Sequence, residues 1–203
     1  KVMKVIIAVD SFKNCLTSNE VSMAIEKGIR RVYKTAEIIK IPLADGGEGT
    51  VDTLISGIGG RIIEVQTHDP LMRPITAKYG ILPNMTAVIE IASTSGISLL
   101  KESERNPLIT TTYGVGELII DALNRGCRDF IIGLGGSATN DGGLGMLEAL
   151  GYRFYDENKQ TLKGTGSSLN KIYYMDDKNK LMILSECHFT VLCDVNNPFY
   201  GKN

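Results

Sequence analysis

The sequence lacks several features that would assign it to a specialised class of protein. It has no tryptophan, two histidines and four cysteines, and no two cysteines form a C-x-x-C pair. A zinc site is therefore not expected, since such sites need closely spaced Cys and His ligands. The formal net charge is −1, which gives no reason to expect a nucleic-acid or membrane partner. No apolar run has the length needed to cross a bilayer.

The composition is otherwise that of an ordinary globular protein, because 43% of the residues are hydrophobic and can supply a substantial core. The apolar run at the N-terminus is too short for a signal peptide and is followed at once by an acid, Asp10. Cys127 and Cys193 lie in or beside apolar runs and are most simply reduced core thiols. We therefore expect a cytoplasmic protein.

The order of the expected elements is typical of an α/β protein. Apolar runs predict three strands, and helical spacing of apolar residues predicts two helices between them. The strands are expected over 5–9, 37–41 and 61–67, and the helices over 21–32 and 48–58. Thr17 and Glu20 have the spacing of a capping box at the start of the first helix. This opening predicts a Rossmann-like parallel sheet in a domain over 1–68.

The pattern changes after Pro70. The expected elements are strands over 75–82 and 86–92 forming a hairpin, a helix over 114–124, a strand over 130–134, a short helix over 144–150, and strands over 152–156 and 189–194. They predict a second α/β domain over 69–203. The first domain lacks the further strands that complete a doubly wound sheet. We therefore expect the chain to be a fragment truncated at its C-terminus.

The most informative segment is the glycine-rich loop over 135–143, between a strand and a helix. Glycines let backbone N–H groups approach an anion, and hydroxyl groups add further donors. An amide oxygen beside a carboxylate is a suitable ligand set for Mg²⁺. The residues in these three roles are Gly135 and Gly136, Ser137 and Thr139, and Asn140 and Asp141. The loop matches neither nucleotide-binding fingerprint. On local grounds, a tight turn capped by Asn140 and Asp141 is an equally good interpretation.

Acidic residues also follow three of the predicted strands, at Asp10, Asp45 and Asp194. In open α/β sheets, ligands bind beyond the carboxyl ends of the strands. The same segments contain further polar or glycine residues, namely Ser11, Lys13, Gly46, Gly47, Glu48 and Asn196. Lys13 is suited to neutralise phosphate or carboxylate oxygens. The alternative is that the acids only cap turns and Lys13 is solvated.

Five blocks of the chain resemble those of the type I glycerate kinases, in the same order and spacing. They cover 10–13, 44–50, 105–116, 133–143 and 193–198. The resemblance implies phosphorylation of glycerate with ATP and Mg²⁺, generally at the 2-hydroxyl in bacterial members, in a cleft between two α/β domains. Val9 and Asn14 depart from the family's usual proline and glycine. Family members extend well past Asn203, so we expect residues 1–203 alone to have poor or no activity.

On this hypothesis Lys13, Asp45 and Asp194 are catalytic, and Asp141 and Asp194 are metal ligands. Either Asp45 or Asp194 is the acid nearer the metal, and the other lies near the reacting hydroxyl. The remaining polar residues of the strand ends and of the loop would contact glycerate or phosphate. A competing hypothesis is a non-catalytic nucleotide- or anion-binding α/β module. Several acids near a polyanion favour the enzyme, since like charges are costly unless a metal bridges them. Homo-oligomerisation is left open.

Overall fold

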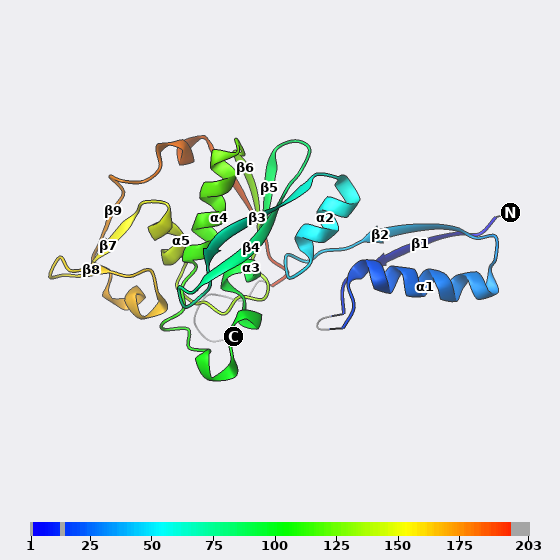
Figure 1. Cartoon of the computed structure of the whole chain (residues 1–203), viewed down its shortest axis with the longest axis horizontal. Coiled ribbons are helices and arrows are strands. Elements are labelled where there is room, and N and C mark those ends of the chain that lie inside the picture. Colours follow the sequence, from blue (N-terminus) through cyan, green and yellow to red (C-terminus); the bar gives the residue numbers. More distant parts are fainter. Residues whose placement is uncertain (1, 13–14, 196–203) are drawn as a thin grey trace.

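The structure, a computed structural model, describes residues 2–12 and 15–195 (Figure 1). Its first unit contains β1 (Lys4–Val9), α1 (Ser18–Val32) and β2 (Glu37–Pro42). The two strands pair in parallel, with Ile6 opposite Ile39. The predicted capping box is confirmed, because the Thr17 side chain accepts from the Glu20 N–H and the Glu20 carboxylate accepts from the Thr17 N–H. Figure 1 shows this unit extending away from the rest of the described chain.

The main unit is a five-stranded mixed sheet with the strand order β10-β6-β5-β4-β3. Its strands are β3 (Arg61–His68), β4 (Pro74–Ile81), β5 (Thr86–Glu90), β6 (Asp129–Gly133) and β10 (His188–Leu192). The β4–β5 hairpin is antiparallel as predicted, while β5, β6 and β10 run parallel. The chain is thus an α/β protein, as expected from its sequence.

One prediction about the sheets is wrong. The third strand was expected to extend the N-terminal parallel sheet, but β3 pairs antiparallel with β4 in the main sheet. The connection between β3 and β4 is short, and a short connection can join antiparallel neighbours but not parallel ones. The change from one sheet to the other therefore falls between β2 and α2 (Thr50–Ile58), earlier in the chain than the expected boundary after residue 68.

Helices cover both faces of the main sheet. Alternate residues of β5 point to opposite faces: Ala87 and Ile89 join a core cluster with Leu118 of α4 (Tyr113–Asn124), whereas Val88 packs with Val51 of α2. All five of these side chains are buried. No helix among the described residues is long and apolar enough to cross a membrane.

The remaining elements are short. They are α3 (Ala92–Ser95), α5 (Leu144–Ala149), β7 (Arg153–Tyr155), β8 (Thr161–Leu162), β9 (Tyr174–Asp176), and 3₁₀ helices over Ile97–Leu99, Glu102–Glu104, Gly166–Lys171 and Met182–Glu186. β7 lies between β8 and β9 in a small antiparallel sheet. The short helix α5 follows the glycine-rich loop, as the sequence predicts.

Candidate active site

Two glycine-rich loops that are distant in sequence meet at the carboxyl end of β6. The Gly135 N–H donates to the Gly46 carbonyl oxygen over 3.1 Å. A Cβ added at Gly133 would overlap that same oxygen, and one added at Gly135 would lie 2.6 Å from the Gly47 Cα. Only glycine permits backbones to approach so closely. The structure thus brings together the two glycine loops that the sequence singled out.

The end of β10 joins this contact as a third segment. The Leu134 N–H donates to the Leu192 carbonyl oxygen over 3.1 Å, and a Cβ added at Gly46 would lie 2.6 Å from that oxygen. Asp45 directly precedes Gly46, and its Oδ1 accepts from the Gly47 N–H over 2.8 Å. Asp194 follows two residues after Leu192 and is exposed. The segments that carry Asp45 and Asp194 are therefore neighbours.

Glu48 reaches across to the segment after α3. Its Oε1 accepts from the Ser98 hydroxyl over 3.0 Å. Both residues line a cavity of about 430 Å³, together with Asp52, Lys78, Glu90 and Ser93. The Lys78 ammonium contacts the Asp52 carboxylate at 2.8 Å. Charged and apolar side chains both border this cavity, which lies beside the start of α2 at the carboxyl end of β5, where α/β sheets bind ligands.

Glu90 is a residue of this region whose importance sequence reasoning missed. It ends β5 and is 6% exposed. Its Oε1 accepts from the Val51 N–H over 2.7 Å. Burial raises the pKa of Glu90, and the backbone N–H of Val51 partly opposes that shift. The available signal was an acid ending an otherwise apolar strand, since a buried carboxylate is costly without hydrogen-bond donors.

Asp141 has a structural role in the glycine-rich loop. Its Oδ2 accepts from the N–H and hydroxyl of Thr112, both over 2.8 Å, and from the Gly145 N–H over 3.1 Å. Its Oδ1 accepts from the Gly143 N–H over 2.9 Å, and the residue is 2% exposed. These contacts favour the capping interpretation over a metal ligand. Residues 2–12 and 15–195 contain no group of three or more His, Cys, Asp or Glu side chains arranged to hold a metal.

Three buried threonines in front of α4 hold the loop in place. Thr110 donates to the Ala138 carbonyl over 2.9 Å, Thr111 donates to the Gly164 carbonyl over 2.5 Å, and Thr112 binds Asp141. Their hydroxyls therefore serve the backbone of the loop and its neighbours. Sequence analysis alone could not separate this role from ligand binding, because a hydroxyl-rich loop is compatible with both.

The rest of the glycine-rich loop is more accessible. The hydroxyls of Ser137 and Thr139 lie 2.7 Å apart and are hydrogen-bonded. Gly136 and Asn140 are exposed. Gly136 has a φ of 74°, a left-handed backbone conformation that residues with a Cβ rarely adopt. These four residues form the open part of the predicted phosphate-binding loop.

The Asp10 segment lies elsewhere in the described structure. Asp10 and Ser11 follow β1, and the Asp10 Oδ1 accepts from the Ser11 N–H over 2.6 Å. Within the described ranges, no hydrogen bond joins them to the glycine-rich loops. Lys13 and Asn196 are outside the described residues, so their predicted roles stay predictions.

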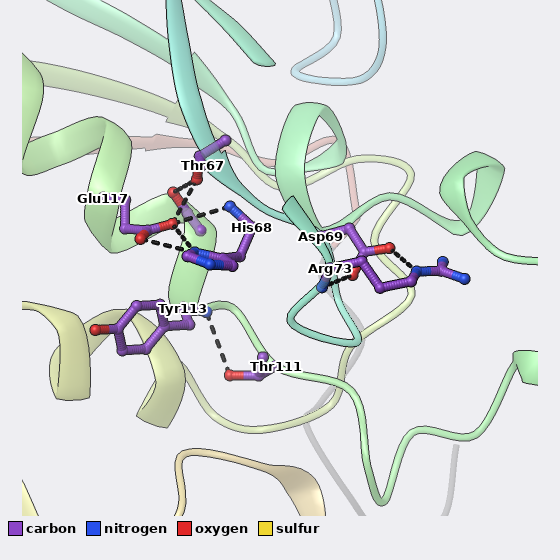
Figure 2. A network of polar contacts seen from close by, with 8 residues as sticks. Thr67, His68, Asp69, Arg73, Thr111, Tyr113 and Glu117 are labelled. Atoms are coloured by element: carbon purple, nitrogen blue, oxygen red, sulfur yellow. Dashed lines mark hydrogen bonds and ion pairs between the residues drawn. The ribbon is translucent and has the colours of Figure 1, made fainter. Parts of the chain in front are cut away.

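A second polar cluster fixes α4 against β3 (Figure 2). The Glu117 carboxylate accepts from the Thr67 hydroxyl over 2.6 Å and from the His68 N–H over 3.0 Å. The His68 Nδ1 lies 2.9 Å from the Glu117 Oε1. The neighbouring Asp69 is buried and pairs with Arg73. This cluster anchors the first half of α4, the helix that begins after the threonine segment, to the end of β3.

The chain is similar to glycerate kinases along its length. A family model described as the glycerate kinase family matches residues 5–203. "Glycerate kinase" of Haemophilus influenzae is 46% identical over 98% of this chain and 53% of its own length. "Glycerate 2-kinase" of Escherichia coli is 44% identical over 99% of this chain and 53% of its own length.

A crystal structure from Salmonella typhimurium LT2, provisionally described as glycerate kinase 2, superposes with a TM-score of 0.85 at 44% identity. The match covers 99% of this chain and 54% of that one. The chain thus spans about half the length of the curated relatives it matches.

Proposed function

This chain belongs to the glycerate kinase family, and we infer from this that it supplies catalytic and binding residues for transfer of the ATP γ-phosphoryl group to a hydroxyl of glycerate. The observation that carries the proposal is the contact between the Gly46 and Gly135 loops, with the Asp45 and Asp194 segments beside it. Such a site places glycine backbone and acids together beyond the carboxyl ends of neighbouring strands, which suits phosphoryl transfer.

The residues divide into two groups in this proposal. The accessible loop around Gly136 and Asn140 faces the phosphate chain, since glycine allows a close approach of the backbone. Asp45 and Asp194 have different roles: one binds Mg²⁺, and the other is the general base that accepts the proton of the reacting hydroxyl. Both carboxylates fit a hard cation, because Asp194 is exposed and Asp45 is only partly buried. When bound, Mg²⁺ neutralises charge on the phosphate oxygens.

The substrate end of the proposed site is the cavity bordered by Glu48 and Ser98. Carboxylate and hydroxyl groups can bind the hydroxyls of a small polyhydroxy acid. We propose 2-phosphoglycerate as the product, a cytoplasmic location, and Lys13 as the residue that neutralises phosphate or carboxylate oxygens. The name of the Escherichia coli relative, "Glycerate 2-kinase", supports the choice of product.

The proposal is tested with the protein as its gene encodes it. ADP release should require glycerate, ATP and Mg²⁺ together, and EDTA should abolish it. Lactate, which lacks the 3-hydroxyl, and glycerol, which lacks the carboxylate, are the matched control substrates. ATP binding without glycerate-dependent ADP release would instead favour the non-catalytic binding module.

A further inference from the structure

Glu90 occupies the point where the main sheet meets both glycine-rich loops. It is the last residue of β5, and its register partner on β6 is Gly133. The next residue, Ile91, donates its N–H to the Gly133 carbonyl over 2.9 Å. The carboxylate of Glu90 is buried, with the residue 6% exposed. Glu90 borders the cavity proposed for the substrate, but the proposed phosphoryl transfer gives its buried carboxylate no chemical step.

A chain of hydrogen bonds leads from Glu90 to the other loop. Its Oε1 accepts from the N–H of Val51 in the first turn of α2. The adjacent Thr50 hydroxyl accepts from the Gly46 N–H over 3.2 Å and donates to the Gly47 carbonyl over 2.8 Å. The Gly46 carbonyl in turn accepts from the Gly135 N–H. α2 is thus hydrogen-bonded both to Glu90 and to the loop whose Gly46 meets Gly135.

Glu90 supplies the acceptor that an N-terminal helical N–H needs. The first N–H groups of an α-helix have no partner within the helix. Gly49, which precedes α2, offers no capping side chain, and no side-chain cap is formed at this position. A carboxylate from β5 thus replaces the usual cap and ties α2 to the sheet.

We propose that Glu90 is a positioning residue, whose hydrogen bond to Val51 sets α2 and thereby holds the Gly46 loop against the Gly135 loop. The link to catalysis rests on the proposed function. The link between Glu90 and the loop contact rests on the hydrogen bonds alone.

The first test compares two substitutions by steady-state kinetics of the full protein. Glu90→Gln keeps an oxygen acceptor for Val51 and should stay within about threefold of the wild-type kcat/KM. Glu90→Met removes the acceptor and should lower kcat/KM about a hundredfold, the scale expected when a site is misplaced by about 1 Å. The fall should be mainly in kcat, because Glu90 acts on loop geometry. Tyr79→Phe is the matched control, since it removes a different buried hydrogen bond, to Asp121.

The second test is independent of activity and uses amide hydrogen exchange at Gly135. Exchange at this N–H should accelerate about tenfold or more in Glu90→Met, and should not change in Glu90→Gln or Tyr79→Phe. If Glu90→Met does not fold, Glu90→Asp replaces it in this test. The aspartate side chain is one methylene shorter, so its carboxylate should not reach the Val51 N–H. Exchange at the Gly135 N–H should then accelerate in a folded protein.

Unchanged Gly135 exchange in the acceptor-removing variant, or equal losses in Glu90→Gln and Glu90→Met, would overturn the positioning role. A wild-type protein without glycerate-dependent turnover would overturn the proposed function. The exchange result at Gly135 would still decide the role of Glu90.

Discussion

Gly133 packs so tightly on Gly46 that a Cβ on Gly133 would overlap the Gly46 carbonyl oxygen. The two residues come from segments of different sheets, because Gly46 follows β2 and Gly133 is the last residue of β6. Their contact converts two separate glycine-rich motifs into one surface. The proposed site therefore depends on backbone shape as much as on its acids.

Gly133→Ala should destabilise the protein and separate the loops. The new methyl group meets backbone that cannot move aside easily, so we expect a loss of about 1–3 kcal/mol or more in the free energy of unfolding. Gly57→Ala is the matched control, because Gly57 lies in α2 with open space around its Cα. That control should gain about 0.5–1 kcal/mol from helix propensity. Urea unfolding measures both, and equal stability of the two variants would contradict the tight contact.

Asp141→Asn should reduce stability without changing the Mg²⁺ requirement. The asparagine side chain has one acceptor oxygen where the carboxylate has two, and its NH₂ group cannot accept. At least one of the donors at Thr112, Gly143 and Gly145 therefore loses its partner. A buried donor without a partner costs about 1–3 kcal/mol, which urea unfolding would detect. A higher Mg²⁺ concentration for half-maximal turnover, with stability unchanged, would restore the metal-ligand hypothesis for Asp141.

Stability should depend on pH through Glu90. Burial raises the pKa of Glu90 above its ordinary value of 4.5, so the folded chain holds this proton at pH values where the unfolded chain has released it. Across that window, the free energy of unfolding falls as pH rises. Glu90→Gln cannot titrate. The stability of the wild type relative to Glu90→Gln should therefore decrease as pH rises from 4.5, and urea unfolding that gave a constant or growing difference would contradict this.

Asp45→Asn and Asp194→Asn should separate the two acid roles. Asparagine at position 45 keeps an oxygen for the Gly47 N–H, so lost activity would report the missing charge. Replacing the base should remove a limb of the pH–rate profile, whereas replacing the metal ligand should raise the Mg²⁺ requirement. If neither variant changes the pH–rate profile or the Mg²⁺ requirement, the two acids have only a structural role.

The sequence predicted those features that local patterns determine. Thr17 and Glu20 form their capping box, and the β4–β5 hairpin pairs as expected. These features depend on residues that are close in the chain. The membership of β3 in the main sheet was missed, because apolar runs predict a strand but do not name its neighbour.

The site was predictable in its parts but not in its connections. The sequence singled out both glycine-rich loops, but it assigned them to different domains and did not predict the contact between Gly46 and Gly135. The role of Asp141 could not be predicted, since an acid in a loop suits a metal or a set of N–H donors equally well. Only the fold shows that Thr112 and Gly145 occupy it. The role of Glu90 likewise depends on its contact with Val51 across the sheet edge.

The most direct test of phosphoryl transfer at the glycine-loop site is product detection by ³¹P NMR. The protein as its gene encodes it would be incubated with ATP, Mg²⁺ and glycerate, alongside its Gly136→Val variant. Valine cannot easily adopt the φ of 74° at this position, and its Cβ would block close approach of a phosphate. We expect a 2-phosphoglycerate signal from the wild type and at least a hundredfold (~2.7 kcal/mol) slower formation by the folded variant. No phosphoglycerate from the wild type, or equal rates for both proteins, would contradict the account.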